Sequence, residues 1–457
     1  MTSNPAPPRM LTVAGSDSGG GAGIQADLRT AALLGCHGSS AITAVTAQNS
    51  RGVQGVYPLD PEAVAAQVES VLSDIGADAV KTGMLFSAEI IRAVSGALAS
   101  QGVERLVVDP VMVAKGGAPL LRDDAREALV RELVPRALLL TPNLPEAEVL
   151  TGMSIRTDAD REEAVGRLLD LGPRAVLLKG GHGSGDEVVD LYAHRDGDRE
   201  VLRSARIPTP NTHGTGCTLS AAVACHLARG EELPQAVRRA RAFLHEAIRG
   251  AYPLGAGHGP TSPWAGSPLV ARARVLESLW EAWEVLEAAN PVELVPEVQS
   301  NLAEAVPGAG SPDEVAAFPG RIVRCGGRIR RVEGPRFGAS RHMAKILLAS
   351  ARWGSPFRAV MNIRYGPDVL DACRAAGLRV EGFSRADEPD EVKRVEGSSL
   401  EWGTLSVLRR CGYAPEAVYD EGDVGKEPMV RIFGTHAPEV ARRVAAVARE
   451  LRKRGDQ

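Results

Sequence analysis

A cysteine at the start of an apolar helical pattern is the clearest candidate for chemistry in this 457-residue chain. The segment HGTGCTLSAAVACHL places Gly214, Thr215 and Gly216 directly before Cys217, where the helix is expected to begin. The first amides of a helix have no partners within it and lie at the positive end of its dipole, so this segment predicts an anion site. A thiol there is expected to have a lowered pKa and to act as a base. The same pattern also fits a flexible turn before a helix around a buried cysteine.

Polar residues follow three other apolar runs that we expect to be strands. Asp109 ends one run in VVDPVM, Asn143 and Glu146 follow another in TPNLPE, and Lys179 follows a third in LLKGGH. Carboxylate and amide oxygens suit a hydrated Mg²⁺ that carries nucleotide phosphates, and a lysine suits a polyphosphate. Each residue alone also fits a helix cap or a turn. Together, at successive strand ends, they predict an ATP and Mg²⁺ site.

Seven motifs in this half of the chain carry a family resemblance. They are AGSDSGGGAGIQADL, TAQN, KTGML, VVDPVM, TPNLPEAE, LLKGGH and HGTGCTLSAA. In order and spacing, over residues 9–262, they resemble the hydroxymethylpyrimidine/phosphomethylpyrimidine kinases of thiamine biosynthesis, in the ribokinase-like superfamily. The resemblance implies ATP-dependent phosphorylation of 4-amino-5-hydroxymethyl-2-methylpyrimidine, and then of its monophosphate, at one site.

The resemblance also implies roles for individual residues. Those implied for the pyrimidine pocket are Gly15, Asp27, Gln48 and Met84. Cys217 is implied as the base and Gly214 to Gly216 as the anion hole. From their positions after strands, and not from the resemblance, we expect Asp109, Asn143 and Lys179 to contact ATP and Glu146 with Asp109 to bind the metal. We expect Gly15 to clear space for the ring, while Asp27 and Gln48 orient it. Gly19 departs from relatives that often carry Ser there.

The second half contains a strongly basic stretch between residues 320 and 349. Its cations are Arg321, Arg324, Arg328, Arg330, Arg331, Arg336, Arg341 and Lys345, opposed only by Glu333. Such runs are most often solvated faces, and nucleic-acid binding is another interpretation. Few aromatic residues lie between these arginines, so phosphate binding is favoured over a stacking platform. Ser340, Arg341 and His342, in GASRH before a helical pattern, predict a second anion site.

Shorter motifs further along suggest more contacts to phosphorylated substrates. The residues expected to bind substrate are Asn362, Arg364, Ser384, Arg385 and Lys426, with Asp423 as a candidate Mg²⁺ ligand beside Glu427. The segments GRI, FGASRHMAKIL, MNIRY, GFSR and GDVGKEP resemble the thiamine-phosphate synthase domain that is fused behind this kinase in archaea and some bacteria. That resemblance implies coupling of the pyrimidine pyrophosphate to thiazole phosphate, with Arg321 and His342 as candidate catalytic groups.

Two alternatives to these functions stay open. Pyridoxal is a second substrate candidate for the kinase, because some relatives with the same thiol phosphorylate it. The C-terminal domain is alternatively a ligand-sensing module that regulates the kinase or transcription.

The elements that must position these residues follow from the apolar pattern. From residue 11 to about 262, short β-rich runs alternate with amphipathic helical stretches, which predicts a ribokinase-like, mostly parallel sheet covered on both faces. The Gly- and Pro-rich stretch 253–268 marks a boundary. We therefore expect a kinase domain at 1–265, a linker at 266–275 and a smaller α/β synthase domain at 276–457.

The composition sets limits on compartment and partners. The net charge is −4 with 24% charged residues, so neither nucleic acid nor a membrane is expected as a partner. No apolar run is long enough to span a bilayer, and the six scattered cysteines suggest neither a zinc site nor disulfides. We expect a cytoplasmic enzyme with small-molecule substrates, and the resemblance implies a homo-oligomer, most simply a dimer.

Overall fold

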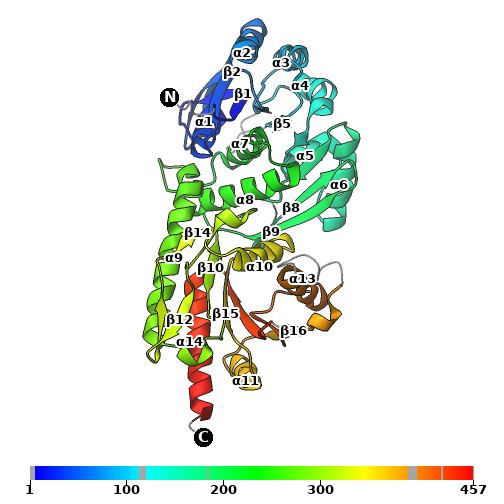
Figure 1. The fold of residues 1–457 in the computed structure, drawn as a ribbon. Coiled ribbons are helices and arrows are strands. Elements are labelled where there is room, and N and C mark those ends of the chain that lie inside the picture. Colours follow the sequence, from blue (N-terminus) through cyan, green and yellow to red (C-terminus); the bar gives the residue numbers. More distant parts are fainter. Residues whose placement is uncertain are drawn as a thin grey trace. The chain divides into compact units, whose positions relative to one another are not determined.

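The computed structural model describes residues 6–112, 120–181, 183, 185–389, 399–423 and 426–455. The chain forms two compact units, Met1–Pro268 and Leu269–Gln457, and each is described by itself (Figure 1).

The first unit is built on one sheet of nine strands. In chain order the strands are β1 (Arg9–Asp17), β2 (His37–Asn49), β3 (Gly52–Pro58), β4 (Ala79–Thr82), β5 (Leu106–Val108), β6 (Leu139–Leu140), β7 (Ala175–Leu178), β8 (Glu187–His194) and β9 (Arg199–Ala205). Their spatial order is β3-β2-β1-β4-β5-β6-β7-β8-β9. The six strands from β2 to β7 in this order are parallel, and β3, β8 and β9 are antiparallel additions. The strand order reverses between β1 and β4, where such sheets bind ligands.

Helices cover both faces of this sheet. They are α1 (Gly23–Leu33), α2 (Pro61–Asp74), α3 (Ala88–Ser100), α4 (Asp123–Ala128), α5 (Leu144–Thr151), α6 (Asp158–Asp170), α7 (Thr215–Ala228) and α8 (Leu233–Arg249), with the turns η1 (Leu129–Leu133), η2 (Val134–Arg136) and η3 (Pro263–Gly266). Side chains alternate along each strand, so Val107 packs with α1, α7 and α8, while Leu106 and Val108 pack with α2, α3 and α6. Burial on both faces explains why these strands are continuous apolar runs. The expected α/β fold with a doubly covered, mostly parallel sheet is confirmed.

The second unit has a seven-stranded sheet and a separate hairpin. The strands are β10 (Leu302–Ala305), β11 (Val315–Ala317), β12 (Ile322–Cys325), β13 (Arg328–Arg331), β14 (Arg336–Phe337), β15 (Ala359–Arg364), β16 (Val380–Phe383), β17 (Ala417–Asp420) and β18 (Met429–Gly434). The sheet order is β14-β11-β10-β15-β18-β17-β16, and β12 and β13 form a separate two-stranded sheet. Only β16 and β17 are parallel neighbours.

The helices of this unit also lie on two faces. They are α9 (Pro268–Ala289), α10 (Arg341–Arg352), α11 (Pro367–Ala375), α13 (Ser399–Cys411) and α14 (Ala437–Gly455), with the turns η4 (Val292–Leu294), η5 (Pro312–Glu314) and η6 (Arg385–Asp387). Residues of α9, α11 and α14 pack on one face, and residues of α10 and α13 on the other. A second α/β region was expected and is present.

The expected linker differs from the structure. Most of residues 266–275 belong to α9, because the buried side chains of Val275, Leu279 and Leu286 continue one helical stripe from this segment into the second unit. The two compact units divide instead between Pro268 and Leu269. None of the helices in the described ranges is both long and apolar enough to cross a membrane.

Candidate functional site

In the first unit the two glycine-rich loops pack directly on each other. A Cβ atom on Gly214 would overlap the carbonyl oxygen of Gly21, and a Cβ atom on Gly21 would overlap the ring of His213. Gly214 also has φ of 80°, a conformation that side-chain-bearing residues rarely adopt. The glycines are therefore needed because two loops, one after β1 and one before α7, touch backbone to backbone.

Asp17 and His213 stabilise this contact between the two loops. The Asp17 carboxylate accepts hydrogen bonds from the amides of Gly19 at 2.8 Å and Ala22 at 2.8 Å, and lies 2.9 Å from His213 Nε2. Burial by itself would raise the pKa of Asp17, but the bonds from His213 and these amides outweigh it and lower that pKa. The sequence interpretation did not single out His213, although it belongs to the same NTHGTGC motif.

Three of the four residues expected in the pyrimidine pocket lie near these loops. A Cβ atom on Gly15 would lie 3.1 Å from Met84 Sδ, so Gly15 makes room for this methionine side chain. Gln48 Nε2 lies 3.3 Å from His213 Nε2. Gly15 and Met84, two of the residues expected in one pocket, are therefore neighbours.

Asp27 differs from the expectation, because its side chain is fully buried. Its Oδ2 accepts hydrogen bonds from Lys81 Nζ at 2.7 Å and from Thr12 Oγ1 at 2.6 Å. Both charged side chains of this ion pair have no exposed surface. Burial raises the pKa of Asp27, whereas the nearby ammonium opposes that rise; Asp27 in turn raises the pKa of Lys81 against its own burial. Lys81, at the end of β4, was missed by the sequence interpretation because it lies inside an apolar strand.

Cys217 lies in the first turn of α7, as expected, and the residue as a whole is partly buried. The expected lowering of its pKa is not found. Burial among side chains raises the pKa of Cys217 to about 11, and this effect exceeds the opposing influence of Lys81 and of a backbone hydrogen bond with Gly23. The thiol is therefore protonated in this structure near neutral pH.

Lys179 and Asp109 meet beside the same helix terminus. Lys179 Nζ lies 2.9 Å from Asp109 Oδ1 and 3.9 Å from Glu146 Oε2. A Cβ atom added to Gly216, just before Cys217, would lie 3.4 Å from Asp109 Oδ2 and 3.5 Å from Lys179 Nζ. Burial alone would lower the pKa of Lys179, but Asp109 and Glu146 raise it. The expected gathering of these residues around the start of α7 is therefore present in the geometry.

Asn143 and Glu146 are also engaged as a helix cap. Asn143 Oδ1 accepts the Glu146 amide at 2.9 Å, and Glu146 Oε2 accepts the Asn143 amide at 2.8 Å. This capping box at α5 is the alternative that the sequence left open for single residues. Burial raises the pKa of Glu146 to about 7, although Lys179 opposes the rise.

A magnesium ion fits here only together with nucleotide phosphates. Asp109 and Glu146 supply two carboxylates near one lysine, and Mg²⁺ bound with phosphates normally takes one or two. Among the residues that the structure describes, no three His, Cys, Asp or Glu side chains group closely enough to hold a metal ion. Asp423, expected as a ligand of a separate Mg²⁺ beside Glu427, belongs to the other unit.

The loop after Lys179 is held by two buried contacts. The Gly180 amide donates to Asp190 Oδ1 at 2.6 Å, and Arg241 Nε donates to Asp190 Oδ2 at 2.7 Å. Arg206 donates to the carbonyl oxygens of Gly181, Gly183 and Gly185. These bonds fix the backbone that follows Lys179.

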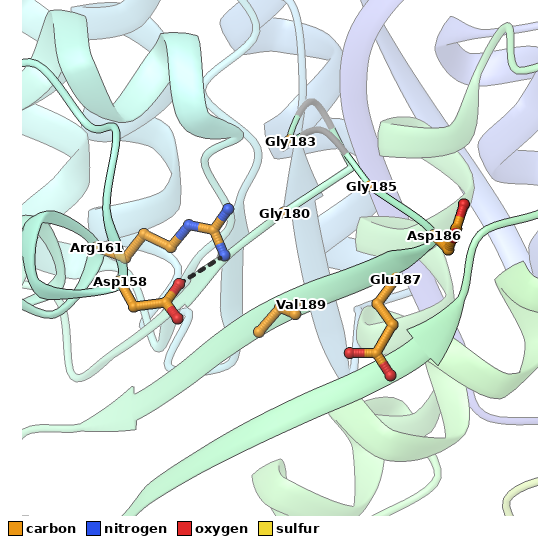
Figure 2. Close-up of a pocket in the computed structure, with 8 residues that line it drawn as sticks. All are labelled: Asp158, Arg161, Gly180, Gly183, Gly185, Asp186, Glu187 and Val189. Carbon is orange, nitrogen blue, oxygen red and sulfur yellow. Dashed lines mark ion pairs between the residues drawn. The ribbon is translucent and has the colours of Figure 1, made fainter.

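A pocket of about 350 Å³ lies beside this loop (Figure 2). Its lining residues are Asp158, Arg161, Gly180, Gly183, Gly185, Asp186, Glu187 and Val189. Arg161 pairs with Asp158 at 3.3 Å. Three carboxylates around one guanidinium disfavour a polyphosphate, so the pocket does not compete with the start of α7 for anions.

In the second unit, the expected anion site lies at the start of α10. Ser340 caps the helix by accepting the Met343 amide at 3.4 Å, and Arg341 and His342 are exposed in its first turn. The helix start is therefore placed as expected.

Arg321 follows one end of the β11–β14 strand pair, and His342 follows the other end. Arg321 follows the end of β11, at the edge where Arg336 of β14 pairs with Ala317. β14 then runs antiparallel, and the Gly338 amide bonds to Val315 at the other end of β11. His342 comes after this reversal, so the geometry gives no support to a single site shared by the two residues.

Arg321 has an unusual backbone conformation. Its φ is 70°, and its guanidinium donates to the Val298 carbonyl. Strained residues of this kind cluster at functional sites. The segment that contains Val298 is held in turn by Glu427, whose carboxylate accepts hydrogen bonds from the amides of Glu297 at 2.8 Å and Val298 at 2.9 Å.

Asn362 and Arg364 are engaged in contacts within the unit. Asn362 is inside β15 and not at its end, and its Oδ1 accepts the Asn301 amide at 2.7 Å. Arg364 pairs with Asp368 at 2.5 Å and donates to the Glu293 carbonyl at 2.7 Å. Both side chains are therefore held by neighbours within the unit.

Arg385 is buried rather than exposed as a phosphate contact. Arg385 and Arg431 both bind Asp420, at 2.6 Å and 2.8 Å, and all three side chains are at least nine-tenths buried. Burial would raise the pKa of Asp420, but the two guanidinium groups lower it. Ser384 caps the following turn by accepting the Ala386 amide. Neither Asp420 nor Arg431 was identified from the sequence, since both lie within apolar strands.

Lys426 and Asp423 close a short turn before β18. The two residues exchange backbone hydrogen bonds of 2.8 Å and 3.1 Å, and Lys426 Nζ lies 3.4 Å from Ser399 Oγ at the start of α13. Asp423 is exposed. Lys426 therefore keeps a cation at a helix N-terminus, where an anion is favoured.

The basic stretch forms the β12–β13 hairpin and the start of β14. Ile322 and Ile329 are buried, whereas Arg324, Arg328 and Arg330 are exposed. Arg331 lies over the ring of Trp280 at 4.4 Å. The expected cationic surface is thus present around a small apolar anchor.

Two family models match the chain. One, described as phosphomethylpyrimidine kinase, matches residues 17–262, and one described as thiamine-phosphate synthase ThiN matches residues 278–446. The hydroxymethylpyrimidine/phosphomethylpyrimidine kinase of Streptomyces coelicolor is 53% identical over 261 residues, covering 57% of this chain and 96% of the relative. The bifunctional protein ThiED of Geobacter sulfurreducens is 54% identical over 254 residues, covering 55% of this chain; the match spans about half of ThiED, 51%.

Solved structures resemble the first unit. Bacillus subtilis pyridoxal kinase, in an ADP complex, matches with a TM-score of 0.53 and 38% identity, covering 56% of this chain and 97% of that one. Staphylococcus aureus pyridoxal kinase, in complex with AMP-PCP and pyridoxal, matches with a TM-score of 0.52 and 35% identity, covering 57% and 93%. The chain belongs to the phosphomethylpyrimidine kinase family, with a ribokinase-like kinase domain followed by a thiamine-phosphate synthase ThiN domain.

Proposed function

We propose that the first unit transfers the γ-phosphoryl group of ATP to 4-amino-5-hydroxymethyl-2-methylpyrimidine and then to its monophosphate. The observation that carries this proposal is the meeting of Lys179, Asp109 and the start of α7 next to Cys217. The strand order reverses at the same edge, between β1 and β4. The named activity of the Streptomyces coelicolor relative and its coverage support the substrate.

Each residue has a proposed task in the transfer. The free amides at the start of α7 and the Lys179 ammonium neutralise charge on the moving phosphoryl group. Cys217 accepts or hydrogen-bonds the proton of the substrate hydroxyl. Asp109 and Glu146 would hold Mg²⁺ together with the phosphates, and the bound ion would supply further charge neutralisation.

Pyridoxal is a second candidate substrate, because the two solved structures described above are named pyridoxal kinases. Rates of ADP formation with the hydroxymethylpyrimidine and with pyridoxal test this directly. A kcat/KM that is at least tenfold higher for the pyrimidine supports the proposal, and the reverse ranking contradicts it.

We propose that the second unit joins the resulting pyrophosphate to thiazole phosphate. Pyrophosphate leaves readily from the methylene carbon, because the aminopyrimidine ring shares the developing positive charge, and nearby cations stabilise the departing oxygens. The exposed arginines of the β12–β13 hairpin, Lys426 and the start of α10 supply such cations. The ThiN model match supports the reaction.

One mixture tests the second proposal against its alternative, a ligand-sensing regulatory domain. The purified chain is incubated with the hydroxymethylpyrimidine, thiazole phosphate, ATP and Mg²⁺, and thiamine phosphate is measured. Formation of thiamine phosphate supports the synthase. Intact kinase activity without that product supports the regulatory alternative.

We also propose that the enzyme acts in the cytoplasm, where ATP is available, and that it assembles as a homodimer. Light scattering on the purified chain tests the assembly, and a monomeric mass at working concentration contradicts it.

A further inference from the structure

The Lys81–Asp27 pair lies in the packed interior between three elements of the first unit. Lys81 ends β4, Asp27 lies on α1, and Cys217 is in the first turn of α7, which packs against both β4 and α1. The pair has no exposed surface, and Lys81 is among the largest fully buried side chains of the chain. The buried cation and the buried anion therefore lie on the two elements against which α7 packs.

Such a pair is costly as a purely structural feature. Removing two charges from water costs several kcal/mol per ion before their attraction is counted, and an apolar pair of similar volume is often as stable. The pairing is also incomplete, because Asp27 Oδ1 has no hydrogen-bond partner in the part of the chain that the structure describes. This unfavourable burial of charge points to an electrostatic role of the pair at the site around Cys217.

We infer that Lys81, held in place by Asp27, is a positioning residue for the kinase reaction that sets the electrostatic potential at the Cys217 sulfur. The inference rests on the proposed role of Cys217 as proton acceptor. In that step Cys217, after it has lost its own proton to solvent, takes the hydroxyl proton as the thiolate, while the new P–O bond to the substrate forms and the P–O bond to ADP breaks. The thiol afterwards releases the proton to solvent.

The charges that act on the thiol support this assignment. Burial raises the pKa of Cys217 most; Lys81 lowers it, and Asp27 and Asp109 raise it. Lys81 comes from β4, Asp27 from α1 and Asp109 from the segment after β5. The two members of the pair therefore have opposite effects on the same sulfur.

Because Lys81 and Asp27 carry opposite charges, removing each of them should change the reactivity of Cys217 in opposite directions. A purely structural role of the pair does not predict this. Lys81→Met removes the cation and Asp27→Asn removes the anion, each with nearly the same shape. The rate of Cys217 alkylation by iodoacetamide at pH 8, followed by peptide mass spectrometry, should fall about tenfold in Lys81→Met and rise about tenfold in Asp27→Asn. Thr12→Val, which removes an uncharged hydrogen bond to Asp27, is the matched control and should stay within about threefold of the parent.

Changes in the same direction for both charge variants, or no change in either, would overturn the inference. If Lys81→Met does not fold, the double variant Lys81→Met/Asp27→Asn replaces it and should react more slowly than Asp27→Asn alone; an equal or faster rate contradicts the inference. Alkylation does not require kinase turnover. If Cys217→Ala keeps full kinase activity, the proposed base fails, while the alkylation rates still decide what Lys81 does.

Discussion

In the first unit the charged residues expected to do chemistry contact one another, whereas in the second unit most are held by separate neighbours. Asp109 and Glu146 each place a carboxylate oxygen within 4 Å of Lys179 Nζ, beside α7. By contrast, Arg364 pairs with Asp368 and Arg385 with Asp420. The difference follows from the strand directions in the two sheets.

In a parallel sheet every strand has its carboxyl end at the same edge, so residues that follow strands meet. The second sheet is mostly antiparallel, and the β11–β14 reversal separates Arg321 from His342. A pattern of polar residues after strands therefore locates a site reliably only in the first unit.

The largest effect is expected at the shared lysine. Lys179→Met should lower the kinase kcat by about 10³-fold, because a charge aimed at the transferred group is lost. Steady-state assays of ADP formation give the value. The same variant should still make thiamine phosphate from supplied pyrimidine pyrophosphate and thiazole phosphate at the parental rate. Loss of both activities in this variant would contradict the assignment of Lys179 to the kinase reaction alone.

A structural role in the second unit is tested at Asp420. Asp420→Asn leaves Arg385 and Arg431 without a buried anion, and should reduce the unfolding free energy of this unit by about 3–5 kcal/mol. Because the folded pKa of Asp420 is lowered, its contribution is full above the unfolded value, near 3.8, and is lost as the pH falls through the folded value. Denaturant titrations at pH 7 and below pH 4 measure both effects. Unchanged stability at pH 7 would mean that the arginines are free to bind substrate.

Cys217 provides a finer test within the first site. Cys217→Ala should slow the first phosphorylation about 10²-fold and the second much less, because the second nucleophile is a phosphate oxygen that is already ionised. Separate assays with the alcohol and with its monophosphate make the comparison. Cys217→Ser, which keeps a small polar group, is the control, and equal losses in both steps would contradict the role as base.

The smallest effect is expected at Glu146. Burial raises the pKa of this carboxyl to about 7, so the group loses its charge as the pH falls below 7. The KM for Mg²⁺-bound ATP should therefore rise a few-fold between pH 8 and pH 6. In Glu146→Gln this pH dependence should flatten, and a profile identical to the parent would contradict the assignment.

The fold of the first unit was predictable because strands buried on both faces give continuous apolar runs between amphipathic helices. Cys217, Asp109 and Lys179 were identified because they lie next to recognisable strand or helix boundaries. Lys81 and His213 were not, since a buried ion pair inside a strand and a histidine between two loops leave no periodic signal. The raised pKa of Cys217 was also missed, because the sequence shows the helix start but not the burial around it.

In the second unit the sequence predicted a basic surface and a helix start, and both are present. It did not predict that Arg385 is buried against Asp420, because both partners are distant in the chain and each alone suggests an exposed charge. The linker was misplaced because Gly and Pro mark the end of the first unit but not the start of α9.

The central claim, that phosphoryl transfer occurs at the start of α7, is tested most directly by a crystal structure with AMP-PCP and the hydroxymethylpyrimidine. We predict the γ-phosphate within hydrogen-bond distance of the Gly216 amide and Lys179 Nζ, with the substrate hydroxyl beside the Cys217 sulfur. Phosphates bound instead in the acidic pocket next to Asp158 and Glu187, or elsewhere on the chain, would contradict the account.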